Sequence, residues 1–188
     1  MRMRLVAVGL IAVLCLFVPA AYGQVAARYA ATGQVSQDKA KMAIQSAVAR
    51  WDANEKVLEI GLFPFDATDE DADKVAKVPV MFNVTDGKPS PDPARWNDPP
   101  YLTFAFRFGD IRETYTAGDV GGCTLNIVNW EKKNSTTVLF LSAGDMKGML
   151  KKFTFSPGTL KDLKFHVKGD KEYEELKGFR YEAAIGGK

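Results

Sequence analysis

The sequence predicts an all-β, mainly antiparallel fold: a single-domain β-sandwich of about 8–9 strands with one short helix, with a closed β-barrel as the alternative. Three observations support this prediction. Several segments alternate between apolar and polar residues with a period of two, which is typical of half-buried strands. Turn-forming residues separate these segments. The regular alternation of strands with helices that indicates a parallel sheet is missing.

The first residues have the composition of a secretory signal peptide. A basic start, Met1 to Arg4, precedes the uncharged run Leu5 to Val18, and small residues follow at Ala21 and Gly23. The apolar run is shorter than the ~20 residues of a membrane-spanning helix. We therefore expect cleavage after residue 23, no membrane span in the mature chain, and a periplasmic or secreted location.

Removal of residues 1–23 changes the charge and the thiol content. The mature chain has 23 acidic residues and, without Arg2 and Arg4, equally many basic ones. This balance argues against nucleic acid as a partner. The positive excess over 145–188 is interpreted as an ordinary solvated surface. Cys123 remains as the single thiol, so an internal disulfide is excluded. We expect it to be a buried small apolar residue, with intermolecular pairing as the alternative.

The first part of the mature chain is less regular than the rest. Residues 24–36 are small and polar, which indicates a flexible arm or an edge strand before a single domain over 37–188. The pattern over 41–51 fits a helix or a strand. We favour a strand of a hairpin because the turn-forming residues 52–55 lead directly into the strand that begins at Val57.

One short helix is predicted after this hairpin. Thr68 and Asp71 have the spacing of a capping box, and Val75 provides an apolar side. A proline-rich connection follows over 85–100, around Trp96, because proline cannot donate a hydrogen bond to a sheet.

The remaining strands are predicted from alternation and apolar runs. The clearest is 101–108, where four apolar residues point one way. Residues 123–130 and 137–141 form a predicted hairpin, and its second strand is apolar on both faces, which predicts a central position in the sheet. The other predicted strands, with weaker patterns in the first two, cover 78–84, 150–155, 163–168 and 179–185.

No residue set indicates a catalytic, cofactor or metal site. His166 is the only histidine and lies on the polar side of its strand, so the usual zinc ligand sets are missing. Ser142 lacks the glycine pattern of a nucleophile elbow, and no helix is evident after it. Asp69, Asp71 and Asp73 match the first ligands of a calcium loop, but its later glycine and glutamate are absent, which favours a helix N-terminus.

The sequence therefore favours an exported soluble protein with a non-catalytic binding or structural role. Trp96, Tyr101 and Trp130 are aromatic residues near connections, and we take them as candidate contacts for a carbohydrate or protein partner. A second interpretation is that they cover the ends of the core. Two other functions stay open: a β-barrel that binds a small apolar ligand, and a glycoside hydrolase with two carboxylates.

Overall fold

A computed structural model describes residues 24–77, 99–170 and 176–186. The described chain is all-β and antiparallel, which confirms the predicted fold class. Its strands are β1 Val25–Gln37, β2 Ala40–Asp52, β3 Val57–Phe63, β4 Tyr101–Phe108, β5 Tyr115–Thr116, β6 Val120–Val128, β7 Thr136–Ser142, β8 Leu150–Phe155, β9 Lys164–Gly169 and β10 Arg180–Ile185. The helices are α1 Asp69–Val75, the 3-10 turn η2 Ala117–Asp119 and α2 Ala143–Met149. The described residues thus hold ten strands and two α-helices, more than predicted.

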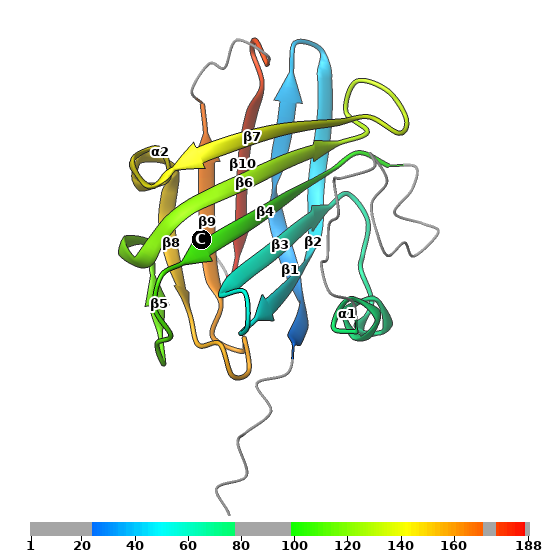
Figure 1. The fold of residues 1–188 in the computed structure, drawn as a ribbon. Helices are drawn as coiled ribbons and strands as arrows, with labels where there is room; N and C mark the ends of the chain where they lie inside the picture. Colours follow the sequence, from blue (N-terminus) through cyan, green and yellow to red (C-terminus); the bar gives the residue numbers. More distant parts are fainter. Residues whose placement is uncertain (1–23, 78–98, 171–175, 187–188) are drawn as a thin grey trace, which may run out of the picture.

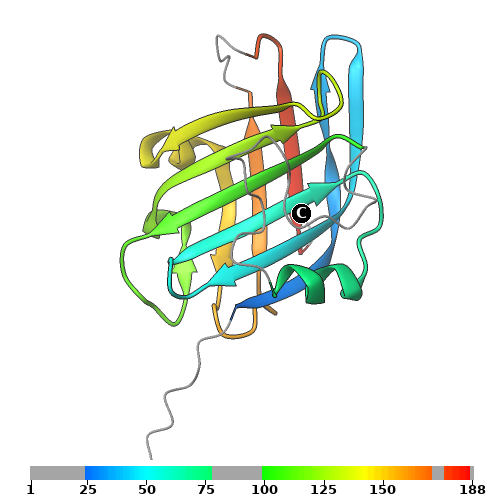
Figure 2. The ribbon, with the colours of Figure 1, turned by 45° about the vertical axis from the view of Figure 1, so that its right-hand side comes forward.

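All ten strands belong to one sheet in the order β5-β8-β9-β10-β1-β2-β3-β4-β6-β7. Figure 1 shows how this sheet curls: β3, β4, β6 and β7 run obliquely in front of β8, β9, β10 and β1. The turned view in Figure 2 shows the same two halves facing each other. The architecture is therefore one continuous curled sheet, and its two halves enclose the core as the two sheets of a sandwich do.

The prediction for residues 24–36 is wrong. β1 lies inside the sheet order: it pairs with β2 along its length, and its residues 31–36 also pair with β10. Its sequence has four alanines among 13 residues, so the large branched residues typical of a central strand are few. Gly33 explains part of this composition, since a Cβ there would lie 2.1 Å from the carbonyl oxygen of Glu182. The close approach of β10 requires small residues in β1.

Several local predictions are confirmed. Residues 41–51 lie within the strand β2, which pairs with β3 across the predicted turn. Thr68 caps α1, and the capping box with Asp71 is formed in both directions. β6 and β7 form the predicted hairpin. α2 was not expected, but Ser142 and Asp145 form a capping box of the same type at its start. The strand expected over 78–84 and the loop over 85–98 lie outside the described residues.

The core is filled by aromatic side chains from both halves of the sheet. Phe104 contacts Phe165 with ring centroids 5.7 Å apart, and Phe106 contacts Phe153 at 5.0 Å. Trp51 packs against Phe155 near the end where β5 joins β8. These ring-to-ring contacts between the facing halves are the arrangement expected of a packed interior.

A second apolar cluster lies beside α1. It combines residues of β2, β3, β4 and β6 with the inner side of α1: Val48, Phe63, Ala67, Ala72, Val75, Tyr101 and Val128. This cluster covers Phe63 on the outer side of β3, and all seven residues of β3 are buried, although alternation predicted one exposed face. Part of the outer face of the sheet is therefore covered.

The predicted central position of β7 is wrong as well. β7 is the last strand of the sheet, and its only strand neighbour among the described residues is β6. Phe140 on its outer side is 82% exposed, although the opposite side of the strand is buried through Leu139 and Leu141. Apolar residues on both faces were interpreted as a sign of two covered faces. The described chain covers only one of them.

Candidate functional site

Two of the three aromatic residues singled out from the sequence, Tyr101 and Trp130, lie apart in the structure, and Trp96 lies outside the described residues. Tyr101 is only 1% exposed, and its ring lies 5.5 Å from that of Phe63 in the cluster beside α1. The half-buried Trp130 packs edge-on against Phe179 at the core, while its Nε1 donates to Oε1 of Gln37 at 2.7 Å. Tyr101 and Trp130 belong to different clusters and offer little surface to a partner.

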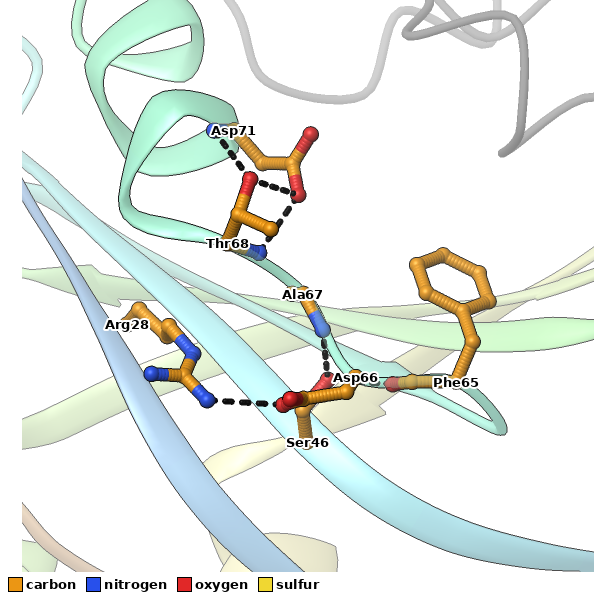
Figure 3. Close-up of polar contacts among 7 residues, drawn as sticks. All are labelled: Arg28, Ser46, Phe65, Asp66, Ala67, Thr68 and Asp71. Atoms are coloured by element: carbon orange, nitrogen blue, oxygen red, sulfur yellow. Dashed lines mark hydrogen bonds and ion pairs between the residues drawn. The ribbon is translucent and has the colours of Figure 1, made fainter.

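Two of the acidic residues around α1 have structural partners: Asp71 belongs to the helix cap, and Asp66 pairs with Arg28 of β1 at 2.7 Å (Figure 3). Figure 3 shows Asp71 accepting hydrogen bonds from the amide and hydroxyl of Thr68, at 2.6 and 2.9 Å. Ser46 on β2 donates to the carbonyl of Phe65 and accepts from the amide of Ala67, which ties the preceding loop to the sheet. These contacts support the interpretation of the acidic run as a helix N-terminus.

Sequence reasoning missed a buried ionic cluster on β2 and β3. Arg50 Nε lies 2.9 Å from Oε2 of Glu59, and Arg50 Nη2 lies 3.5 Å from Oδ2 of Asp52. Asp52 also accepts from the backbone amides of Asn54 and Glu55 in the β2–β3 turn. All three charged side chains are buried. Because the arginine contacts both acids and neither acid lines a hollow described below, this cluster holds the hairpin together.

Cys123 is a buried core residue, as predicted. Its side chain is 5% exposed, and burial raises the pKa of its thiol. A thiol that stays protonated is a poor nucleophile. The folded chain therefore presents Cys123 neither as a catalytic group nor for pairing with another chain.

Ser142 is likewise a structural residue. A helix does follow it, contrary to expectation, but the hydroxyl caps that helix: it donates to Oδ2 of Asp145 at 2.8 Å and accepts from the amide of Asp145. These contacts are those of a helix cap, and the only histidine, His166, is not among them.

A small hollow lies near η2 in the loop region between β4 and β6. It measures about 220 Å³ and is lined by residues including Arg112, Tyr115 and Asp119. Arg112 pairs with Asp119 at 3.0 Å, and hydrogen bonds from Thr116 lower the pKa of that carboxyl. The Tyr115 hydroxyl donates to the carbonyl of Asp110. These contacts bind the loop to itself, so the hollow is a consequence of the loop conformation.

A larger hollow, of about 290 Å³, lies on the outer face of β9, β10 and β1. It is lined by Gly33, Ala183 and Ala184 together with the polar residues Thr32, Gln34, His166 and Glu182. The strand register explains which side chains meet there. One row across the sheet holds Thr32, Ala184, His166 and Lys152, and the neighbouring row holds Gln34, Glu182 and Lys168.

His166 and Glu182 are joined in this hollow. The His166 Nε2 lies 3.1 Å from Oε1 of Glu182, while Nζ of Lys168 lies 3.7 Å from the other carboxylate oxygen. His166 is half-buried, so the expected fully solvated position is only partly correct. The hollow thus presents hydroxyl, amide, imidazole and carboxylate groups on Thr32, Gln34, His166 and Glu182, with Lys168 beside it through its contact with Glu182, a set that suits hydroxyl-rich ligands.

The surface around the hollow is basic. The charged residues on the outer face of β8, β9 and β10 are exposed or half-exposed: Lys152, Lys164, Lys168, Arg180 and the single acid Glu182, with the exposed Lys151 at the bulge beside them. Asp170, just after β9, accepts from Arg180 through its backbone carbonyl. The period of two in these strands sorts the apolar residues into the core and the lysines onto one surface. We call this surface the basic face.

Comparisons with known proteins add no relative, since no protein-family model, no curated protein and no solved structure matches this chain. Within the described ranges, none of the helices has the length and apolar character needed to cross a membrane. The same part of the chain holds no cluster of three or more histidine, cysteine, aspartate or glutamate side chains suited to a metal ion.

Proposed function

We propose that this protein is exported and that its basic face binds an acidic polysaccharide without cleaving it. The concentration of basic side chains on the outer face of β8, β9 and β10 is the observation that carries this proposal. Basic patches of this kind are typical of surfaces that bind sulfated or carboxylated glycans. Antiparallel strands lie about 4.8 Å apart, so the lysines form a grid that suits a regularly charged chain.

The hollow favours a sugar chain over other anionic partners. Its mixed donors and acceptors around Gln34 and Glu182 match the hydroxyl groups of a sugar ring, while Lys164 and Lys168 are placed beside it for acidic substituents. A membrane surface is less favoured, because the exposed large apolar side chains among the described residues, Ile111 and Phe140, are not on β8, β9 or β10.

Binding without catalysis is the simpler function for this face. His166 and Glu182 are its only acid–base pair, and they contact each other directly at 3.1 Å. A glycoside hydrolase needs two carboxyl groups about 5–10 Å apart on either side of the bond that is cleaved. Within β8, β9 and β10 the outer face carries one carboxylate, that of Glu182.

The proposal is tested by binding to two acidic polysaccharides, heparin and alginate, in a titration at low and high salt. We expect binding to at least one of them, weakened by salt. Lys164→Glu with Lys168→Glu should lower the affinity by about tenfold or more, because two attractive charges become repulsive. The control variant, Lys77→Glu with Lys132→Glu, changes the net charge equally on exposed residues outside the basic face.

Three results would contradict this function. Equal weakening by both double variants would mean that net charge alone drives binding. Binding to vesicles of anionic phospholipid but to neither polysaccharide would make the partner a membrane. If mass spectrometry shows that alginate oligosaccharides become shorter during incubation with the protein, the alternative function of a glycoside hydrolase is supported instead.

Export is tested separately, by mass spectrometry of the protein recovered from the producing cell. We expect a mature N-terminus at Gln24, because the small residues at 21 and 23 suit a signal peptidase. A retained N-terminal segment would contradict export by cleavage.

A further inference from the structure

The edge strand β7 has the composition of a paired strand. It spans Thr136–Ser142 with the sequence TTVLFLS, which contains no charge and no proline. β6 occupies one side of it, and β7 is the last strand of the sheet on the other side. Phe140 stands on its outer face with 82% of its surface exposed. Figure 1 shows β7 at the margin of the curled sheet.

Natural sheets protect such edges. Lysines, prolines, bulges or a very short strand prevent the unpaired backbone groups from joining a strand of another chain. The opposite edge of this sheet follows that rule, because β5 has only two residues and β8 beside it carries two lysines and a bulge. β7 has seven residues, and its register with β6 is continuous from Thr136 to Ser142. Within the described residues no strand covers this edge, and together with the exposed phenylalanine this indicates a surface that a partner covers.

The side chains of β7 match a second copy of the same strand. If two copies lie antiparallel about Leu139, then Val138 of each copy lies opposite Phe140 of the other, and Thr136 lies opposite Ser142. Every pair on the outer face is then apolar with apolar or polar with polar, and cross-strand pairs of this kind stabilise a sheet. The strand is uncharged, so no like charges meet along the edge.

We propose that β7 pairs with β7 of a second copy of this chain, which joins the two sheets across a twofold axis. Such an interface is closed, because each copy uses its one long edge. The charges at the ends of the paired strands are also complementary. The β6–β7 loop of one copy, with Lys132 and Lys133, comes beside the start of α2 in the other, where Asp145 lies.

The area of contact sets the expected strength. Pairing of two seven-residue edges and covering of two phenylalanine rings buries less than the ~1,200 Å² of a standard stable interface. We therefore expect a reversible dimer with a dissociation constant of about 10–100 µM. The contact is distinct from the basic face on β8, β9 and β10, so both surfaces are usable at once.

The test is sedimentation equilibrium of the purified chain over a wide concentration range, with paired charge variants. Wild type should shift from one chain to two as concentration rises. The double variant Val138→Lys with Phe140→Lys should remain a single chain at every concentration, because lysines would face lysines across the interface. The double variant Val138→Glu with Phe140→Glu should also remain a single chain, because glutamates would face glutamates. An equal mixture of the two variants should recover the two-chain species, because each lysine then faces a glutamate.

The control is Ile111→Lys, which changes another exposed apolar residue, away from β7, and should dimerise like wild type. Circular dichroism checks that each variant is folded. Single chains of wild type at all concentrations would overturn the proposal, as would assemblies larger than two chains. A wild-type dimer that survives both charged variants would show that another surface forms it.

Discussion

At the scale of single residues, the clearest difference from expectation is the environment of Glu59. Alternation predicted that this side chain points to the other face of its strand from Leu58 and Ile60. The structure confirms that Glu59 lies on that other face. The side itself, however, is buried, and Glu59 pairs with Arg50 from the neighbouring strand. Alternation reports which residues share a face. Whether that face meets water depends on segments distant in the sequence.

Arg50 links two buried carboxylates, so its loss should be costly. We expect Arg50→Met to lower the free energy of unfolding by about 3–5 kcal/mol, because Glu59 and Asp52 lose the cation between them. Urea unfolding measures this difference. Lys74→Met is the control: it breaks an exposed pair with Glu70 and should cost about 0.5 kcal/mol or less. Equal costs would contradict a structural role for the buried cluster.

Residue types alone identified Cys123 as a buried residue, because an unpaired cysteine usually packs as a small apolar group. They did not identify the hollow between His166 and Glu182. That hollow depends on the register of β9, β10 and β1, and on the missing side chain at Gly33. Register between strands that are distant in the sequence is not encoded in any local pattern.

At the scale of elements, helix starts were predictable where a capping box precedes an apolar helical side, as at Thr68 and Asp71. The same spacing at Ser142 and Asp145 led to no helix prediction, although α2 is as long as α1. The reason is its position: α2 begins directly after β7 and runs directly into β8, so no loop separates its residues from the two strand patterns.

The two caps give a prediction for these helices. Thr68→Ala and Ser142→Ala should each lower the free energy of unfolding by about 1 kcal/mol, because each removes the acceptor for a helix amide. Urea unfolding gives the cost, and Thr68→Ser, which keeps the hydroxyl, should restore most of it. No loss in Thr68→Ala would mean that packing against the sheet alone holds α1.

Both errors about strand position have one origin. β1 was assigned to the margin because its residues are small, and β7 was assigned to the centre because its residues are apolar. The structure reverses both. Small residues in β1 allow β10 to approach closely, and the apolar outer side of β7 fits a partner from outside the chain. The composition of a strand indicates whether its faces are covered by apolar groups. It does not indicate whether the same chain or another molecule covers them.

At the scale of the whole molecule, length and alternation were sufficient for the all-β antiparallel class. They were insufficient for the shape, because the curl of one ten-stranded sheet is the sum of many small twists between neighbours. The phenylalanines of β4 meet those of β8 and β9 across the interior, so the two halves pack directly against each other.

This packed interior predicts a negative result with lipophilic ligands. The rings of Phe104 and Phe106 contact Phe165 within 6.0 Å, so a fatty acid would have to displace them. We expect titration with a fluorescent fatty acid to show no saturable binding of one ligand per chain. Such binding, with displacement by an unlabelled fatty acid, would favour the β-barrel that holds an apolar ligand.

The pairing of β1 with β10 has a consequence for how the chain acquires its fold. The first strand in the sequence, β1, pairs with the last one, β10. For example, Val35 lies opposite Tyr181, and these two residues are close to the two ends of the described chain. Contacts between residues so distant in the sequence form slowly, because a long loop must close first. Until β10 has been synthesised, residues 31–36 of β1 lack a neighbour on one side and the sheet cannot be completed. A chain of this topology stays incompletely folded until β10 emerges, and an incompletely folded polypeptide can still be threaded through a narrow channel.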